Sequence, residues 1–274
     1  MLDIKRLDHF GLVAGIIRDL KLIELIDSHF ELDKQENIST GEAIAGMIIN
    51  GLGFTQMPMT LTPKFFENKP LDILFREDVQ VSYFNRFKLG RALDDLYNYG
   101  IEALFSQIAL NVCEQEGIKM NYSHLDTSSF SLTGEYIPDS DENAIQITYG
   151  YSKDHRPDLK QAILELVVTQ DGGIPFICQC HDGNASDNKI FQERVVNLVD
   201  QIKNGRQPTC VVMDSKGYTT KNLPLLMQIP FITRVQANFA LEVTIIDQAL
   251  DFKEQWHDIN DEYRCQSFEF GYLN

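Results

Sequence analysis

The spacing of the apolar residues changes once along this chain, at Ile118. Up to Gly117 these residues recur every three or four positions, which is typical of amphipathic helices. From Ile118 to Asp126, alternate residues would share one face of an extended strand. The change predicts a helical domain over residues 1–117 and a sheet-containing domain after it.

The order of the later segments predicts the kind of sheet. Apolar runs and turn residues predict strands over 128–137, 161–169, 174–180, 209–213 and 231–235, and helices over 187–204, 223–227 and 240–250. Antiparallel strands followed by alternating strands and helices are typical of a ribonuclease H-like mixed sheet flanked by helices, an α+β or α/β fold class. We expect this core over 118–250, followed by the start of an incomplete insertion subdomain over 251–274.

Composition excludes several classes of protein. The 274 residues are 43% hydrophobic, which supports a packed core, yet no apolar run reaches the length of a membrane span. The N-terminus lacks the apolar segment of a secretory signal. The five cysteines show no disulfide framework and suit a reducing cytoplasm. A cytoplasmic protein without a membrane partner is therefore expected.

The net charge of −16 counts against binding of nucleic acid by the chain as a whole, because phosphate contacts need cations. Acidic residues are most concentrated near the C-terminus. Between Glu242 and Asn274 there are eight of them but only two basic residues, Lys253 and Arg264. The distribution of charge matters more than the sum, so a local basic site stays compatible with the composition.

Two aspartates stand where predicted strands end. Asp126 closes the segment that begins at Ile118, and Asp214 follows the apolar run 209–213. Strands that deliver single carboxylates to one edge of a sheet can build a two-metal site, since Mg²⁺ prefers such oxygen ligands. Either aspartate could instead be a turn or capping residue, because the Ser and Thr residues that follow favour local hydrogen bonds.

Several polar groups could assist such a site. His124 would share the strand face of Asp126, either as an occasional metal ligand or as an ordinary sheet histidine. The densest basic cluster of the chain could contact phosphate groups; its members are Lys153, His155, Arg156 and Lys160. The side-chain amide of Asn184 could contact DNA as well. The alternative is a solvated loop in which these cations pair with Asp154 and Asp158, and a helix cap near Asn184.

Two further features have weaker functional readings. Cys178, Cys180 and His181 lack a second cysteine pair at zinc-ligand spacing, so ordinary thiols are expected. The N-terminal helices could read DNA ends or form protein contacts. Acidic residues flank Arg18 and Lys21 there, which favours protein contact over a basic recognition helix.

Several phrases of the sequence resemble an insertion-sequence transposase of the DDE type, in a branch with an all-helical N-terminal domain. The most specific of them is Gly150-Tyr-Ser-Lys-Asp-His-Arg-Pro-Asp-Leu-Lys-Gln161. The others, spread over nearly the whole chain, are Leu7-Asp-His-Phe-Gly-Leu-Val-Ala14, Phe65-Phe-Glu-Asn-Lys-Pro70, Leu125-Asp126-Thr-Ser-Ser-Phe130, Gly183-Asn-Ala-Ser-Asp187 and Met213-Asp214-Ser.

The resemblance implies a ribonuclease H-like catalytic domain in which Asp126 and Asp214 are the first two of three metal-binding carboxylates. It implies an enzyme that uses Mg²⁺ or Mn²⁺ to cut DNA at transposon ends and to join the 3′ ends to target DNA. We also expect a homo-oligomer in the bacterial cytoplasm, associated with the nucleoid when it is bound to DNA.

The chain departs from this family at the third carboxylate. The family carries it as a glutamate in a Tyr-Arg-Glu-Lys type motif after a β-rich insertion, and no such motif precedes Asn274. The resemblance is therefore to a transposase shortened at its C-terminus, with a lone strand over 263–272. Glu242 and Asp247 are the fallback third ligands. The alternatives are a ribonuclease H-like nuclease that does not transpose, and a truncated regulatory partner of a full-length transposase.

Overall fold

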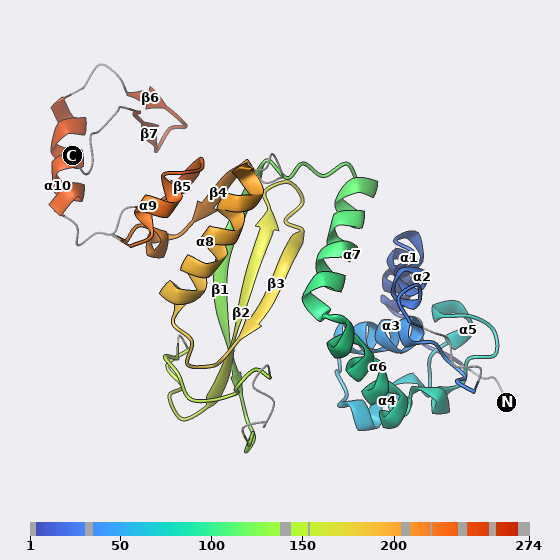
Figure 1. Ribbon diagram of the computed structural model, residues 1–274. Helices are drawn as coiled ribbons and strands as arrows, with labels where there is room; N and C mark the ends of the chain where they lie inside the picture. Colours follow the sequence, from blue (N-terminus) through green and yellow to red (C-terminus); the bar gives the residue numbers. More distant parts are fainter. Residues whose placement is uncertain are drawn as a thin grey trace. The chain divides into compact units, whose positions relative to one another are not determined.

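Helices come first in this protein, and a mixed five-stranded sheet flanked by helices follows (Figure 1). The computed structural model describes residues 4–30, 35–137, 144–152, 154–203, 209–219, 221–234, 240–251 and 256–267. Two compact units are present: Met1–Lys119 with Leu166–Gln179, and Met120–Glu165 with Cys180–Asn274. The predicted fold class is confirmed.

The N-terminal helices pack around an aromatic core. They are α1 (Phe10–Asp19), α2 (Leu22–Asp27), α3 (Thr40–Gly51), α4 (Thr62–Phe66), α5 (Leu71–Leu74), α6 (Arg86–Tyr99) and α7 (Ile101–Gln115), with short 3₁₀ turns at Met59–Leu61 and Val81–Phe84. Phe66 and Phe84 are fully buried, and their ring centroids lie 4.6 Å apart. The helical spacing of apolar residues therefore buries one continuous core.

Helix α3 begins with a reciprocal cap. The Glu42 backbone N–H donates to Ser39 Oγ at 3.0 Å, and the Ser39 N–H donates to Glu42 Oε2 at 2.9 Å. Each of these bonds satisfies a backbone donor that the helix itself leaves unpaired. Arg76 Nε donates to Glu42 Oε1 at 2.6 Å, which ties the cap to a distant segment. Ser39 is therefore the N-cap of α3, with a complete capping box.

The five-stranded sheet has the order β3-β2-β1-β4-β5. Its strands are β1 (Tyr122–Leu132), β2 (Lys160–Thr169), β3 (Pro175–His181), β4 (Cys210–Met213) and β5 (Phe231–Thr233). Strand β4 runs parallel to β1 and to β5. The turn between β2 and β3 uses positive φ at Gly172 and Gly173, as a tight hairpin requires. This order and direction are those of a ribonuclease H-like sheet.

Strand β1 differs from the sequence prediction. The segments 118–126 and 128–137 were expected as separate strands, but Tyr122–Leu132 is one continuous strand. No glycine or proline lies between Asp126 and Leu132 to reverse the chain. Serine and threonine residues continue the extended backbone there, so Asp126 stands inside β1 rather than at its end.

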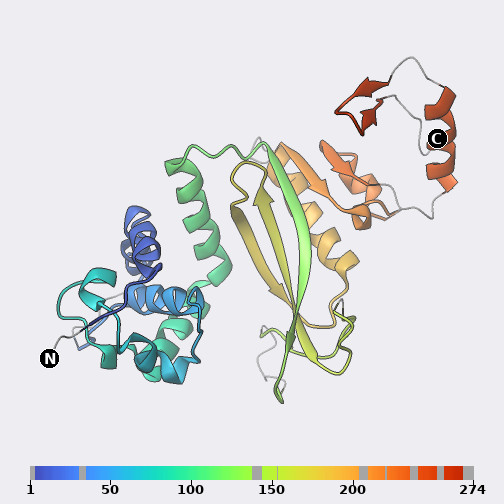
Figure 2. The same ribbon diagram turned by 180° about the vertical axis from the view of Figure 1, so that it is seen from behind.

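The remaining helices belong to the second unit: α8 (Asp187–Lys203), α9 (Leu223–Leu226) and α10 (Ala240–Asp251), with a 3₁₀ turn at Ser215–Gly217. Helix α8 lies across one face of the sheet, in front of it in Figure 1 and behind it in Figure 2. None of the helices in the described ranges is long and apolar enough to cross a membrane.

The C-terminal part forms a small hairpin. Strand β6 (His257–Asp258) pairs antiparallel with β7 (Arg264–Cys265). The lone strand expected over 263–272 is therefore wrong in its first residues, because β7 has a partner. Residues 268–272 of that prediction lie outside the described residues.

Candidate metal and nucleic-acid site

The pairing of β1 with β4 brings Asp126 and Asp214 to matching positions. Leu125 and Met213 are partners in this parallel ladder. Asp126 follows Leu125 within β1, and Asp214 is the first residue after β4. Adjacent strands lie about 4.8 Å apart, so the two backbones are neighbours at this edge of β4. The two residues stand 88 positions apart in sequence, and the fold places them side by side.

Asp126 lies on the sheet face away from α8. A Cβ atom added at Gly217 would meet both the Met213 side chain and the ring of Phe191, which belongs to α8. Met213 therefore points towards α8, as does its ladder partner Leu125. Because side chains alternate along a strand, Asp126 points to the opposite face, and it is exposed. Asp214 is exposed too.

Local hydrogen bonds fix the backbone at both positions. The Thr127 N–H donates to Asp126 Oδ1 at 2.7 Å. The Asp214 carbonyl oxygen accepts from Thr233 Oγ1 at 2.6 Å and from the Gly217 N–H at 3.1 Å. The bond from the Gly217 N–H matches the turn-forming alternative for Asp214, whereas Asp126 lies inside β1 and not in a turn. The bond from the Thr127 N–H also holds the Asp126 side chain in place, as a ligand site requires.

The donor set suits a divalent cation with hard ligand preferences. Two exposed carboxylates on neighbouring strands offer anionic oxygens that can share or bridge metal ions. A cation between them would also offset the repulsion of two like charges. His124 is half-buried on the same strand face, two residues before Asp126, and its ladder partner is Val212.

The fallback third ligands are not brought into this set. Glu242 is half-buried and Asp247 exposed, both on α10. Within the described ranges, no three His, Cys, Asp or Glu side chains lie close enough together to hold a metal ion. A third carboxylate is therefore still a prediction, as are Asp126 and Asp214 as ligands.

Two members of the predicted basic cluster, Lys160 and Arg156, are engaged by other residues of the chain. Lys160 Nζ donates to the Glu135 carbonyl oxygen and, at 2.7 Å, to that of Tyr136. Arg156 forms two hydrogen bonds with Asp158, at 2.8 and 2.7 Å. This pairing raises the pKa of Arg156 and lowers that of Asp158.

Two of the other predicted DNA-contacting residues, His155 and Asn184, are accessible to solvent. His155 is exposed with a positive φ of 56°, and Asn184 is exposed as well. Lys153 lies outside the described residues. DNA contact by the cluster remains a prediction, and the internal pairs show how Arg156 and Lys160 shape the loop without any ligand.

A close backbone contact anchors this loop. A Cβ atom on Gly150 would overlap the Gly183 carbonyl oxygen, and one on Gly183 would overlap the Gln161 carbonyl oxygen. The buried Gln161 side chain donates from Nε2 to the Gly183 oxygen at 2.7 Å and to the Tyr151 oxygen at 3.2 Å. Both glycines and this glutamine belong to the sequence phrases described above, so part of their role is to hold the loop.

A buried charged cluster was not anticipated. Glu165 on β2 is 1% exposed and contacts His181 on β3 and Arg194 on α8. A sequence signal for it does exist. Glu165 occupies a position of β2 at which every alternate residue from Gln161 to Thr169 is buried. A carboxylate at such a position needs a charged or hydrogen-bonding partner.

Comparisons with known proteins give limited further information. A family model described as "Domain of unknown function (DUF4277)" matches residues 2–110. No match was found among the curated proteins.

Several solved structures are similar to this chain. The Mos1 transposase paired-end complex with left transposon end shows 12% identity over 90% of this chain and 85% of that chain, with a TM-score of 0.28. A pre-cleavage Mos1 transpososome shows 10% identity over 90% and 85%, with a TM-score of 0.27. The fold itself follows from the strand order given above.

Proposed function

We propose that this protein is a DNA transposase that uses Asp126 and Asp214 for metal-dependent strand cleavage and 3′-end joining in the movement of an insertion sequence. One observation supports the proposal: Asp126 and Asp214 each directly follow a member of the Leu125–Met213 pair in the parallel ladder of a ribonuclease H-like sheet, and both are exposed. The sequence phrases that resemble DDE transposases support the same reading.

The chemistry assigned to each side chain follows from its position. Asp126 would supply ligand oxygens from the middle of a long strand, and Asp214 from the end of a short parallel one. When bound, Mg²⁺ or Mn²⁺ would lower the pKa of the attacking water or 3′-hydroxyl and stabilise the leaving 3′-oxygen. The bond from the Thr127 N–H holds the Asp126 carboxylate in place, and the bond from the Thr233 hydroxyl to the Asp214 carbonyl oxygen fixes the backbone at the second position.

Two observations favour a second function. Within the described residues no third carboxylate joins the pair, and the net charge is −16. A chain of this kind could act as a regulatory partner that assembles with a complete transposase and blocks it. It would bind that partner without metal-dependent cutting of its own.

The test is a reaction of the chain with labelled donor DNA and Mn²⁺ or Mg²⁺. Cleavage products together with strand-joining products support a transposase. Cleavage without joining supports a nuclease of the same fold. If neither product forms, while the chain lowers the activity of an added complete transposase, the regulatory function is favoured.

A further inference from the structure

A small pocket in the N-terminal helical unit gathers cations in an otherwise acidic chain. It has a volume of about 260 Å³, and its lining includes Arg6, Lys64 and Lys69 with a single carboxylate, that of Asp8. The three cations come from the segment before α1, from α4 and from the turn after α4. Pockets for drug-sized ligands usually begin at about 300 Å³, so this one suits a small group such as a phosphate.

The cations in this pocket are incompletely neutralised. Lys69 Nζ donates to the Phe65 carbonyl oxygen at 2.5 Å and lies 3.8 Å from the centroid of the Phe65 ring. Burial lowers the pKa of Lys69, Asp8 opposes this shift, and the charge of Arg6 adds to it. Arg6 lies 3.8 Å from Asp8 and remains 76% exposed. An anion in the pocket would stabilise both cations.

An exposed aromatic ring stands beside these cations. Phe54 is part of the pocket lining, yet it is 88% exposed. Its contact with His9 is T-shaped, at 4.5 Å between ring centroids and an interplanar angle of 64°, so the two rings are not stacked. Bare aromatic rings beside cations are the feature by which proteins bind unpaired nucleic-acid strands, because every base can stack and every phosphate needs a cation.

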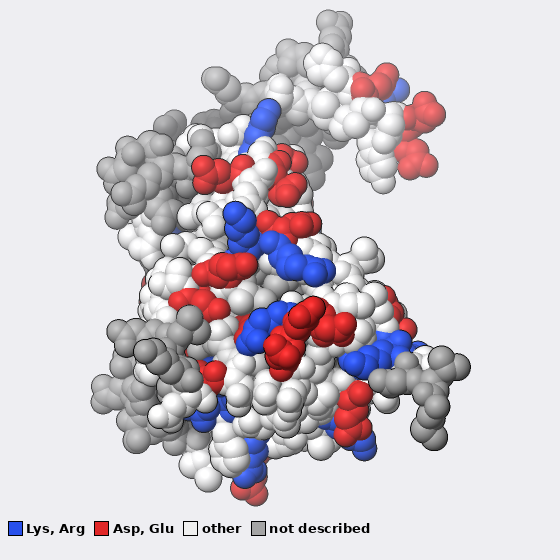
Figure 3. Space-filling model, turned by 90° about the vertical axis from the view of Figure 1, so that its right-hand side faces the viewer, with Lys and Arg blue, Asp and Glu red and all other residues white. Residues whose placement is uncertain are grey.

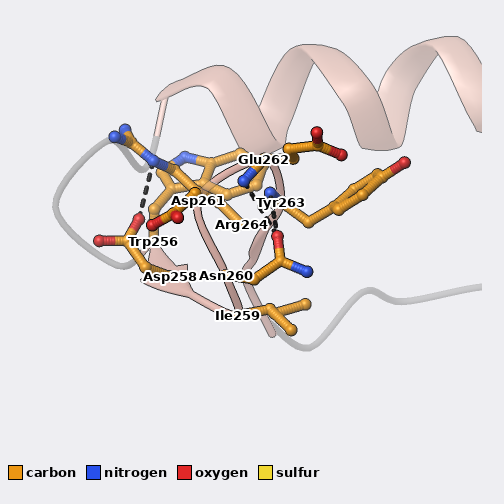
Figure 4. A pocket seen from close by; sticks show the side chains of 8 residues that line it. All are labelled: Trp256, Asp258, Ile259, Asn260, Asp261, Glu262, Tyr263 and Arg264. Carbon is orange, nitrogen blue, oxygen red and sulfur yellow. Dashed lines mark hydrogen bonds and ion pairs between the residues drawn. The ribbon is translucent and has the colours of Figure 1, made fainter.

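The larger pocket at the C-terminal hairpin has the opposite character. Asp258, Asp261 and Glu262 line it, and Arg264 Nε is already 2.9 Å from Asp258 Oδ1 (Figure 4). Lysine and arginine side chains are interspersed with acidic ones on the face shown in Figure 3, and its described residues form no continuous basic surface there. A phosphate is therefore better accommodated by the pocket around Lys64.

We propose that the pocket formed by Arg6, Lys64 and Lys69 binds a phosphate of an unpaired DNA strand while a neighbouring base stacks on Phe54. The inference rests on DNA being the partner in the proposed function, and it gives the N-terminal unit a role in holding the strand. The cations come from separated segments, so no helix of the sequence shows them as a basic face.

Binding of a single strand to the full chain tests this site. The probe is a fluorescein-labelled oligodeoxynucleotide of about 16 nucleotides, an upper site size for one binding module, in EDTA so that no cutting occurs. Lys64→Glu should weaken binding by about tenfold and reduce the slope of log affinity against log salt by about 0.7, as for one phosphate contact. Phe54→Ala should weaken binding by at least about fivefold through loss of stacking.

Matched variants make the result specific. Lys119→Glu gives the same charge change at an exposed lysine outside the pocket and should bind as the original chain does. If Lys64→Glu and Phe54→Ala bind like Lys119→Glu, the site is rejected. It is also rejected if Phe54→Ala alters only self-association. A chain that binds the strand through this pocket yet never cuts DNA would keep the inference and reject the transposase.

Discussion

Arg194 of α8 and Glu165 of β2 form two hydrogen bonds, from Nε to Oε1 at 2.6 Å and from Nη2 to Oε2 at 3.2 Å. His181 Nε2 lies 2.9 Å from the same Oε2 atom. The Glu165 side chain is almost fully buried, and the Arg194 side chain is mostly buried. The cluster therefore attaches α8 to the sheet. It lies on the face that α8 covers, opposite to that of Asp126.

The Glu165 cluster should make stability depend on pH in the acid range. Burial raises the pKa of Glu165, but hydrogen bonds from His181 and Arg194 outweigh burial, and the net pKa lies below the usual 4.5. A carboxylate with a lowered folded-state pKa adds stability above its unfolded pKa and loses it as pH falls through the folded value. Urea unfolding curves from pH 7 down to pH 3 should show that loss.

Glu165→Gln isolates this contribution. Removing one partner of a buried ion pair should lower the free energy of unfolding by about 3 kcal/mol at neutral pH, and the difference should shrink in acid. Glu193→Gln, at an exposed position of the same helix, should change stability very little. An equal loss for both variants would contradict a structural role for the cluster.

Substitution of either Asp126 or Asp214 should abolish DNA cleavage without unfolding the protein. Asp126→Asn and Asp214→Asn keep the size of the side chain but remove the anionic oxygen that a metal needs. Circular dichroism and urea midpoints should match those of the original chain, while labelled-DNA cleavage falls by at least about a hundredfold, the scale seen when metal-site partners are lost. Full cleavage by a folded variant would reject the assignment.

Divalent metal should stabilise the second unit through the same two residues. A ligand that binds only the folded state adds RT ln(1 + [L]/Kd), about 2.7 kcal/mol at a hundredfold excess over Kd. Titration with MnCl₂ should therefore raise the melting temperature, and EDTA should reverse the rise. The double variant Asp126→Asn/Asp214→Asn should show no rise. A rise of the same size in that variant would place the ion elsewhere.

Gly183→Ala should destabilise the protein because its Cβ atom would overlap the Gln161 carbonyl oxygen. Backbone atoms cannot move aside as a side chain end can, so a loss of about 2–4 kcal/mol is expected, within the range of severe single substitutions. Gly90→Ala is the control, since nothing lies within 4 Å of that position inside α6. It should raise stability by about 0.5–1 kcal/mol through helix propensity.

Much of the fold follows from local sequence rules, and the exceptions have a physical reason. Ser39 and Glu42 sit three residues apart, so their cap is visible in the sequence. The two-strand prediction for β1 fails because serine and threonine suit turns and strands alike, and packing decides between them.

The sequence predicts some features of the candidate site, and other features depend on how the elements pack. The ends of two apolar runs identify Asp126 and Asp214, whereas their side-by-side placement depends on which strands pair. The Glu165–Arg194 contact joins a strand to a helix 29 residues later, and the Lys64 pocket joins three segments. The alternation of β2 indicates that Glu165 is buried, but no periodic pattern identifies its partner or the members of the pocket, because these residues meet only after the elements have packed.

The number of residues in β1 before Asp126 decides on which face of the sheet the carboxylate lies. Four positions separate Tyr122 from Asp126, and Tyr122 is aligned with Cys210 of β4. Deleting one residue between them would turn the carboxylate towards α8, although the strand itself could still form. Deleting two would restore the face but displace the carboxylate by about 6.6 Å along the strand. Natural length variation in this protein should therefore be tolerated in the loops after Leu132 and excluded from the few residues before Asp126.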